Sequence, residues 1–147
     1  QIFVEKRKRA NQPVLCFEGD VRQAMANIIT NAIDAMPNGG RLQLRSRNGR
    51  RWKTGQKGLI LTIADSGTGM DKETSSRKFE AFFSTKGIGG SGLGLWISAE
   101  IMHRHGGEIT IRTSRSRSCR GTVVQLFLPF LMDPGKILPS TVPTLCA

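Results

Sequence analysis

Hydrophobic and polar residues alternate with a period of about two in several short stretches of the chain, a pattern typical of half-buried strands. The alternation and the neighbouring turn residues predict six strands, over residues 2–8, 14–18, 41–45, 59–64, 108–113 and 122–128. The stretch Leu59–Ala64 is the most apolar of these and is expected to be a central strand. The last two strands are expected to form a hairpin around the basic turn Ser114–Gly121.

Two longer stretches show helical periodicity. The first begins after Asp20, a good N-cap residue, with Gln23 three positions later in a capping-box-like pair. Its predicted buried face consists of Val21, Met25, Ile28, Ile29, Ile33 and Met36. The second covers about residues 92–105, and its predicted buried side chains are Leu95, Trp96, Ala99 and Met102. Glycine pairs follow both helices and are expected to end them.

Strands mixed with helices that lie on one face predict an α+β fold. We expect a two-layer α/β sandwich, with a mixed, mostly antiparallel sheet of about five strands packed on about three helices. The glycine-rich segment 66–91 shows little periodicity, and a loop of this length in a compact domain is usually functional. Residues 1–130 are expected to form one domain and residues 131–147, rich in proline and small residues, a loose tail.

The length and composition of the chain limit the classes of protein to which it can belong. The chain has 147 residues and no apolar run near the ~20 residues that a membrane span needs. Its first residues lack both a starting methionine and the pattern of a signal peptide, so we interpret the chain as an excised, cytoplasmic piece of a longer protein, whether or not the parent is membrane-anchored. The three cysteines are scattered, without the spacing of zinc ligands, which fits a reducing compartment.

The net charge of +11 comes largely from basic clusters at residues 6–9, 41–53 and 112–120. Such charge can attract nucleic acid, acidic lipid or nucleotide phosphates. The clusters lack interleaved aromatic residues, which favours solvated strand faces and loops over a nucleic-acid site. A basic nucleic-acid-binding module therefore stays only as an alternative.

Three segments carry candidate nucleotide chemistry. Asn27 and Asn31 share one helical stripe, where amide oxygens could ligate Mg²⁺, although two solvated asparagines would look the same. Asp65, at a predicted strand end before Gly67 and Gly69, could accept a hydrogen bond from the adenine amine, although the segment also fits an ordinary turn.

The third segment, Gly87–Leu95, places glycine-rich backbone at a helix N-terminus, where free N–H groups favour phosphate. It contains Gly-x-Gly-x-x-Gly, but no strand precedes it in a βαβ unit, which excludes the dinucleotide-binding interpretation. The sequence also lacks a Walker A motif and the signatures of Ser/Thr/Tyr kinases.

In this order and spacing, the segments resemble the nucleotide-binding boxes of the histidine kinase-like ATPase family, which has the Bergerat fold, over residues 2 to 130. Asn27, Asn31 and Ala32 resemble its asparagine box, and Asp65–Gly69 its first glycine box. Phe79–Lys86 resembles the phenylalanine box, which narrows the resemblance to histidine kinases. Gly90–Leu95 resembles the second glycine box, with Ser91 where threonine is more usual.

The resemblance implies the role of each matching residue. Asn31, helped by Asn27, would hold the Mg²⁺ that bridges the ATP phosphates, and Asp34 would bind through water or face solvent. Asp65 would bind the adenine amine, together with Thr122 through a water. The ATP-binding set is Asn27, Asn31, Asp34, Asp65, Gly67, Gly69, Lys86, Gly90, Ser91, Gly92, Leu93, Gly94, Leu95 and Thr122.

Residues 70–91 would form the ATP lid. Phe79, Phe82 and Phe83 would anchor it, and Lys86 would be the cation that meets the γ-phosphate, with Arg77 as its substitute. These three phenylalanines are explained equally well as ordinary core residues.

The resemblance also implies the reaction. Hydrolytic branches of the family place a glutamate general base four residues before the Mg²⁺ asparagine, and this chain has Asn27 there, which cannot activate water. The expected activity is therefore that of an ATP-dependent histidine kinase domain, in which Asn31, Asn27 and Lys86 support transfer of the γ-phosphate. The phosphate would pass to a histidine on a separate dimerisation domain of the same parent chain and then to a response regulator.

Neither histidine of the chain, His103 or His105, matches an acceptor motif, and both fit the end of a helix. The fragment is expected to be a monomer that does not phosphorylate itself. Two alternatives besides nucleic-acid binding stay open: a serine kinase similar to anti-sigma factors, with the same fold, and a degenerate interaction domain.

Overall fold

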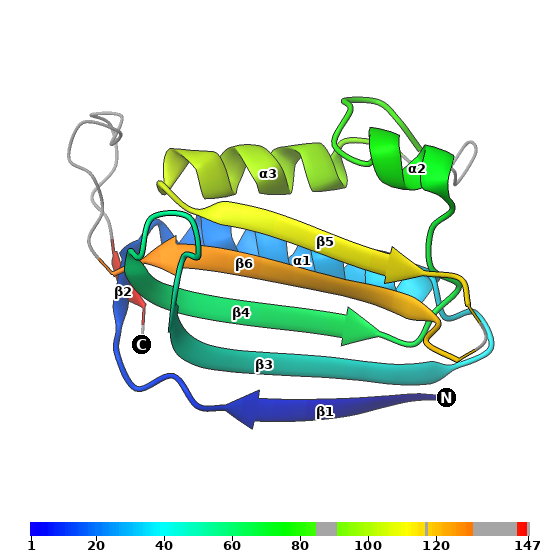
Figure 1. Cartoon of the computed structure of the whole chain (residues 1–147), viewed down its shortest axis with the longest axis horizontal. Coiled ribbons are helices and arrows are strands. Elements are labelled where there is room, and N and C mark those ends of the chain that lie inside the picture. The colour runs from blue at the N-terminus through cyan, green and yellow to red at the C-terminus, as the bar shows by residue number, and fades with distance from the viewer. Residues whose placement is uncertain (85–90, 117, 131–143, 147) are drawn as a thin grey trace.

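The computed structural model describes residues 1–84, 91–116, 118–130 and 144–146 of the chain. Its elements form two layers, a five-stranded sheet and the helices α1 and α3 against one face of it (Figure 1). The strand order is β1-β3-β4-β6-β5, where the strands are β1 (Ile2–Lys8), β3 (Gly40–Arg50), β4 (Lys57–Asp65), β5 (Glu108–Ser114) and β6 (Gly121–Pro129).

The sheet is mixed but mostly antiparallel, as predicted. β1 pairs with β3 in parallel, and the other three pairings are antiparallel. β4 is the central strand, and β5 and β6 form the expected hairpin. Together with α1, α3 and the short helix α2 (Lys72–Arg77), these strands confirm the predicted α+β class.

A second, two-stranded sheet lies beside the first. β2 (Val14–Cys16) pairs in antiparallel fashion with β7 (Thr144–Cys146), which belongs to the predicted C-terminal tail. The rest of that tail, residues 131–143 and 147, lies outside the described residues. β1 and β2 follow each other along the chain but pair with different partners.

α1 (Glu18–Asp34) begins three residues earlier than predicted. Its N-cap is Phe17, with no side-chain cap, so the prediction that Asp20 caps the helix is wrong. Asp20 instead lies in the first turn, where a carboxylate is favourable, and pairs with Arg104 at 2.9 Å. The backbone N–H of Phe17 donates to Nε2 of the buried His105 at 3.0 Å, which ties the start of α1 to the end of α3.

The buried face of α1 is narrower than the predicted stripe. Val21, Ala24, Ile28 and Ala32 are buried, and Met36 follows them beyond the helix. Met25 and Ile29 are only partly buried, and Ile33 is 44% exposed. The prediction favoured large apolar side chains, whereas the crossing with α3 requires small ones: Ala24 packs there beside Ser98, which is fully buried.

α3 (Gly94–Arg104) differs from its prediction in a similar way. Ser98, Ile101 and Met102 are its buried residues, and Leu95 packs partly against the core. Trp96 was expected to be buried but is 41% exposed. None of the helices in the described part of the chain combines the length and the apolar character that a membrane span requires.

The register of the strands determines how three polar residues at one end of the sheet lie relative to one another. Asp65, at the end of β4, lies directly opposite Thr122 of β6, and Thr122 lies opposite Thr113 of β5. Opposed residues share one face of a sheet, so these three side chains lie together on the face that the helices cover.

Candidate functional site

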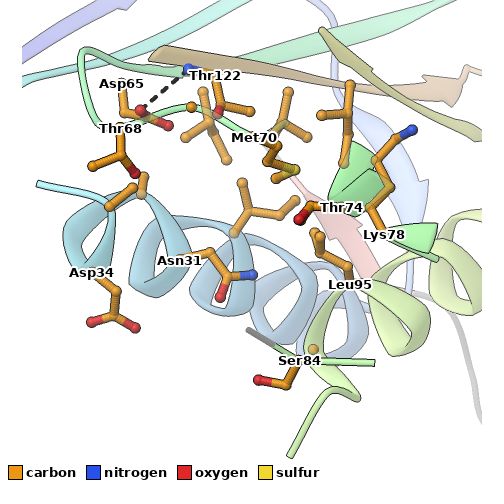
Figure 2. A pocket seen from close by; sticks show the side chains of 18 of the residues that line it. Asn31, Asp34, Asp65, Thr68, Met70, Thr74, Lys78, Ser84, Leu95 and Thr122 are labelled. Atoms are coloured by element: carbon orange, nitrogen blue, oxygen red, sulfur yellow. Dashed lines mark hydrogen bonds between the residues drawn. The ribbon is translucent and has the colours of Figure 1, made fainter. Parts of the chain in front are cut away.

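A cavity of about 330 Å³ opens between α1, the end of β4 and the start of α3 (Figure 2). Its walls come from segments that are far apart in the sequence. The polar and charged side chains around it are those of Asn31, Asp34, Asp65, Thr68, Thr74, Lys78, Ser84, Ser91 and Thr122. Apolar side chains, among them Ile28, Ile63, Met70, Leu95, Ile111 and Val124, form the rest of the lining.

The two carboxylate oxygens of Asp65 have different surroundings. Oδ1 accepts hydrogen bonds from the backbone N–H groups of Gly67 at 2.8 Å and of Thr122 at 3.2 Å, the second drawn in Figure 2. No hydrogen bond from the described residues reaches Oδ2, which leaves this oxygen as an acceptor for a ligand in the cavity. Burial raises the pKa of Asp65, and the two backbone hydrogen bonds offset part of that rise.

Thr113 connects this end of the cavity to the segment that follows β4. Its Oγ1 accepts from the backbone N–H of Met70 at 2.8 Å and lies 3.1 Å from Oγ1 of Thr122. Sequence reasoning missed Thr113, because its contact with Met70 depends on how the segment after β4 packs against the hairpin of β5 and β6.

The turn between β5 and β6 holds the same segment at further points. Arg120 donates to the carbonyl of Thr68, and Arg115 forms an ion pair with Asp71, each at 3.4 Å. Gly69 has φ +66°, and a Cβ atom on it would lie 2.1 Å from the carbonyl oxygen of Ser114. Only glycine therefore fits at this position.

The two asparagines of α1 have different environments. Asn31 lines the cavity, whereas the Asn27 side-chain amide donates to the carbonyl of Gly94 at 3.2 Å and joins α1 to the start of α3. Asp34, exposed to solvent, also lines the cavity. Among the described residues no group of three His, Cys, Asp or Glu side chains could hold a metal by itself.

A single amide oxygen still fits one kind of metal site. Mg²⁺ uses few protein ligands and fills its octahedron with phosphate oxygens and water. The donor chemistry around Asn31 therefore fits Mg²⁺ bound together with a phosphate ligand.

The second glycine-rich segment forms the wall beside Asn31, since a Cβ on Gly94 would lie 4.0 Å from Nδ2 of Asn31. Ser91, Gly92, Gly94 and Leu95 line the cavity, and α3 begins there with Leu93 as its N-cap and no side-chain cap hydrogen bond. The first N–H groups of a helix have no partner within the helix. Gly92 has φ +66°, and its missing Cβ would lie 2.4 Å from the carbonyl carbon of Phe82. The backbone of the predicted lid at Phe82 and Phe83 therefore packs directly against this glycine.

α2 lies within the predicted lid, and its N-cap Asp71 accepts from the N–H of Thr74 at 2.8 Å. Arg77 stacks on Phe83 at 4.3 Å and pairs with Glu80 at 2.9 Å. Phe83 lines the cavity, as an anchor of the lid would.

Phe82 differs from the expectation that it anchors the lid. Its side chain is 77% exposed and its backbone has φ +66°, unusual for a residue other than glycine. The prediction that this side chain anchors the lid is therefore wrong.

The predicted site residues divide into three groups. The structure brings together around the cavity Asn31, Asp34, Asp65, Gly69, Ser91, Gly92, Gly94, Leu95 and Thr122. Asn27, Gly67 and Leu93 lie beside it and contact its lining through the hydrogen bonds of Asn27 to Gly94, of Gly67 to Asp65 and of Leu93 to Ser91. Lys86 and Gly90 lie outside the described residues.

Lys78 is the cation that sequence reasoning missed. It follows α2, lines the cavity, and its ammonium group lies 5.3 Å from the ring centroid of Phe79. Among the described lining residues it is the one basic side chain, opposite the two carboxylates Asp34 and Asp65. No signal in the sequence distinguishes it from the neighbouring basic residues of the lid.

The histidines lie away from this cavity. His105 is 1% exposed, and its Nε2 accepts the N–H of Phe17 while its Nδ1 lies 2.8 Å from the carbonyl of Ile101. These contacts fix the tautomer with the proton on Nδ1. The buried ring of His105 therefore connects α1 and α3 and has a structural role.

Comparison with known proteins agrees with this geometry. Residues 17–132 match the family described as histidine kinase-, DNA gyrase B-, and HSP90-like ATPase. Sporulation kinase E of Bacillus subtilis (strain 168) is 32% identical over 117 residues, which cover 80% of this chain and 15% of that protein. Sensor kinase CckA of Brucella abortus (strain 2308) is 35% identical over 131 residues, which cover 82% of this chain and 14% of that protein.

The chain thus spans about a seventh of the length of these two relatives. Among solved structures, the mycobacterial sensor histidine kinase MprB has a TM-score of 0.69 at 26% identity, with 88% of this chain and 84% of that chain covered. The chain therefore belongs to the histidine kinase-, DNA gyrase B-, and HSP90-like ATPase family, and within it the chain resembles the ATP-binding domains of sensor histidine kinases.

Proposed function

We propose that this domain binds ATP together with Mg²⁺ and donates the γ-phosphate to a histidine on a separate dimerisation domain of its parent chain, in two-component signalling. A response regulator would receive the phosphate next. The observation that carries the proposal is the convergence of Asp65, Asn31 and the start of α3 on one cavity. The ATP-binding unit would be residues 1–130, acting in the cytoplasm.

Adenine would bind at the end of the cavity that Asp65 closes. Oδ2 of Asp65 would accept the exocyclic amine, because Oδ1 is already held by the N–H groups of Gly67 and Thr122. The hydroxyl of Thr122, beside that of Thr113, would add a polar contact through a water. Apolar walls at Ile63, Met70 and Val124 suit the faces of a flat base.

The phosphates would bind at the end formed by Asn31 and the start of α3. N–H groups at a helix N-terminus favour anions, and Gly92 and Gly94 leave the backbone accessible. Asn31 would provide the protein ligand of Mg²⁺, which would neutralise charge on the phosphates. Lys78 would add a positive charge from the lid side, a role that the sequence assigned to Lys86.

The environment of Asn27 supports kinase rather than hydrolase chemistry. Its amide donates to the carbonyl of Gly94 and offers no base that could activate water. In the transfer step, a ring nitrogen of the acceptor histidine bonds to the γ-phosphorus, the bond to the β–γ bridging oxygen breaks, and ADP leaves. Such transfer requires mainly positioning and charge neutralisation, which the cavity residues supply.

Labelled ATP tests the proposal directly. The chain, the dimerisation hairpin of its parent kinase and γ-labelled ATP with Mg²⁺ are incubated together, and the phosphorylated product is treated with acid and with alkali. We expect label on the hairpin that is labile in acid and stable in alkali, as for a phosphorylated histidine. An Asn31→Ala chain should give little label, and replacing the acceptor histidine of the hairpin should abolish it.

Two outcomes contradict the proposal. Acid-stable label on serine would assign the chain to the serine kinases similar to anti-sigma factors. Release of free phosphate at the same rate with and without the hairpin would assign it to the hydrolytic branches.

A further inference from the structure

α1 carries more apolar surface than the sheet covers. Besides its buried face, it has a second stripe in which Met25 and Ile29 are only partly buried, and Ile33, which continues this stripe, is 44% exposed. These residues follow each other at i, i+4 and i+8, so they lie along one side of the helix. That side is directed toward β1, the edge strand of the sheet, because Met25 and Ile29 line the same groove as Lys6 and Lys8.

The inner face of β1 is uncovered from Val4 onward, whereas Ile2, nearer the N-terminus, packs partly against the core. Its register with β3 places Val4, Lys6 and Lys8 on the same face as the core residues Leu42 and Leu44. Val4 is nevertheless 55% exposed. The helix layer therefore ends before it reaches β1.

A groove of about 900 Å³ lies between these two uncovered surfaces. Its floor is apolar, from Leu44, Leu59 and Leu61 of the sheet, and its wall on the helix side is formed by Val21, Met25 and Ile29. The groove involves neither Asn31 nor Asp65, and among the described residues the buried Ile63 is the one that it shares with the lining of the nucleotide cavity.

The rim of the groove is basic. Lys6, Arg7, Lys8, Arg22 and Arg45 border it, against the single carboxylate of Glu18. Glu18 is already paired with Arg22, and Arg7 with Glu5. Lys6 and Lys8 form no ion pair with any carboxylate of the described residues, although both border an apolar floor.

We propose that this groove binds an acidic amphipathic helix of a partner protein. The apolar stripe of that helix would lie against Met25, Ile29 and Leu44, and its acidic residues would meet Lys6 and Lys8. Helices bind apolar grooves through anchors spaced by three or four residues, and those of the partner would pack against Met25 and Ile29 of α1. The charge on the rim selects an acidic partner and speeds its association.

Other occupants fit less well. A small anionic ligand requires polar groups that converge inside a pocket, whereas the cations here stand on the exposed rim above an apolar floor. A bilayer surface is flat and would leave the concave floor uncovered.

A designed peptide provides the test. The probe is a labelled, helix-forming peptide with leucines on one face and glutamates on the flanks, and the control is a scrambled peptide of the same composition. Fluorescence anisotropy with the full chain should show binding of the amphipathic peptide, at least about tenfold tighter than that of the scrambled one.

Charge reversal locates the binding. Lys6→Glu with Lys8→Glu should weaken binding about tenfold or more at low salt, and high salt should reduce this difference. Lys72→Glu with Arg112→Glu changes the net charge equally, at exposed positions outside the groove, and should have a much smaller effect.

Ile29→Gln should also weaken binding. All four lysine and arginine positions are exposed, so these variants should stay folded, and ATP affinity should not change with the pair at Lys6 and Lys8.

The proposal is overturned if the native chain does not bind the amphipathic peptide or binds the scrambled peptide equally well. Equal losses from the two charge-reversed pairs would also overturn it, because they would indicate attraction to the net charge alone. Binding of acidic phospholipid vesicles that depends on Lys6 and Lys8, without binding of the peptide, would assign the groove to lipid instead.

Discussion

The two carboxylate oxygens of Asp65 have different surroundings. Oδ1 accepts hydrogen bonds from the backbone of Gly67 and Thr122, and Oδ2 faces the cavity. Burial raises its pKa because the charged form loses hydration. A raised carboxyl pKa means that the folded state binds the proton more tightly than the unfolded state does. The negative charge of Asp65, which we propose to bind the adenine amine, therefore lowers the stability of the fold at neutral pH.

This arrangement predicts a pH dependence. As pH falls through the raised pKa of Asp65, protonation removes the acceptor for the adenine amine, and ATP affinity should fall. The contribution of this group to the free energy of unfolding should change in the opposite direction and become more favourable as pH falls. Titration of affinity and of unfolding against pH, in the native chain and in Asp65→Asn, checks both signs. If the native chain and the variant had the same pH profile for affinity, Asp65 would not be the group responsible.

Thr113 supports a second prediction at this scale. Thr113→Val removes the acceptor of the Met70 N–H and leaves a partly buried donor unpaired, which costs about 1–3 kcal/mol. We expect faster hydrogen exchange at the Met70 amide and a lower affinity for ATP. Thr113→Ser keeps the hydroxyl and should restore both. Equal exchange rates in the valine and serine variants would contradict this role.

Among the elements, α1 shows most clearly how burial divides one helix. Ile28 is 2% exposed and lies in the core, whereas Ile33 on the same helix is 44% exposed. Ile28→Ala should lower the free energy of unfolding by about 2–5 kcal/mol, and Ile33→Ala by about 0.5 kcal/mol or less. Denaturant unfolding of both variants checks the difference. Equal losses would show that the second stripe is covered in the folded chain.

Gly92 of the second glycine box and Gly55 of the turn between β3 and β4 form a matched pair of glycines. Gly92 and Gly55 have φ of +66° and +67°, but a Cβ at Gly92 would meet the Phe82 backbone at 2.4 Å, whereas nothing lies within 4 Å of one at Gly55. Gly92→Ala should therefore displace the lid and weaken ATP binding, whereas Gly55→Ala should show only the modest strain of its backbone. Calorimetry with an ATP analogue compares them. Unchanged affinity in Gly92→Ala would show that the contact of Gly92 with the Phe82 backbone does not affect ATP binding.

Local patterns explain which elements the sequence could predict. Alternation located the strands of the main sheet, and the segments with the asparagines and glycines located part of the cavity lining. The parallel pairing of β1 with β3 and the pairing of β2 with β7 have no local signal, because strand partners are chosen by the tertiary packing. Thr113 and Lys78 were missed for a similar reason: Thr113 contacts the segment after β4 and Lys78 lies at the cavity through the position of α2, and both depend on tertiary packing.

Errors about burial have a related cause. A buried helix face is predicted from large apolar side chains at helical spacing, which favours Ile33 and Trp96. Small residues such as Ala24 and Ser98 do not stand out in this pattern, although the crossing of α1 and α3 buries them. The N-cap was misplaced because the buried His105, distant in sequence, meets the backbone at the start of α1.

At the scale of the whole molecule, the two-layer architecture places the residues of the proposed nucleotide site at one end of the sandwich. The end of β4, the second half of α1 and the start of α3 meet there, and α2 lies beside them (Figure 1). The groove with the basic rim lies along the first half of α1 and the end of β1. One helix thus contributes to both sites, with Asn31 to the cavity and Met25 to the groove.

Calorimetry of a non-hydrolysable ATP analogue, with and without Mg²⁺, tests the central claim most directly. The native chain should bind in the micromolar range, and more tightly with Mg²⁺. Asp65→Asn should lower the affinity about 10- to 100-fold while the domain stays folded, since it removes a charged acceptor worth roughly 1.5–3 kcal/mol. Asn31→Ala should abolish the gain from Mg²⁺. Absence of binding by the native chain, or full binding by Asp65→Asn, would contradict the account of this cavity as an ATP site.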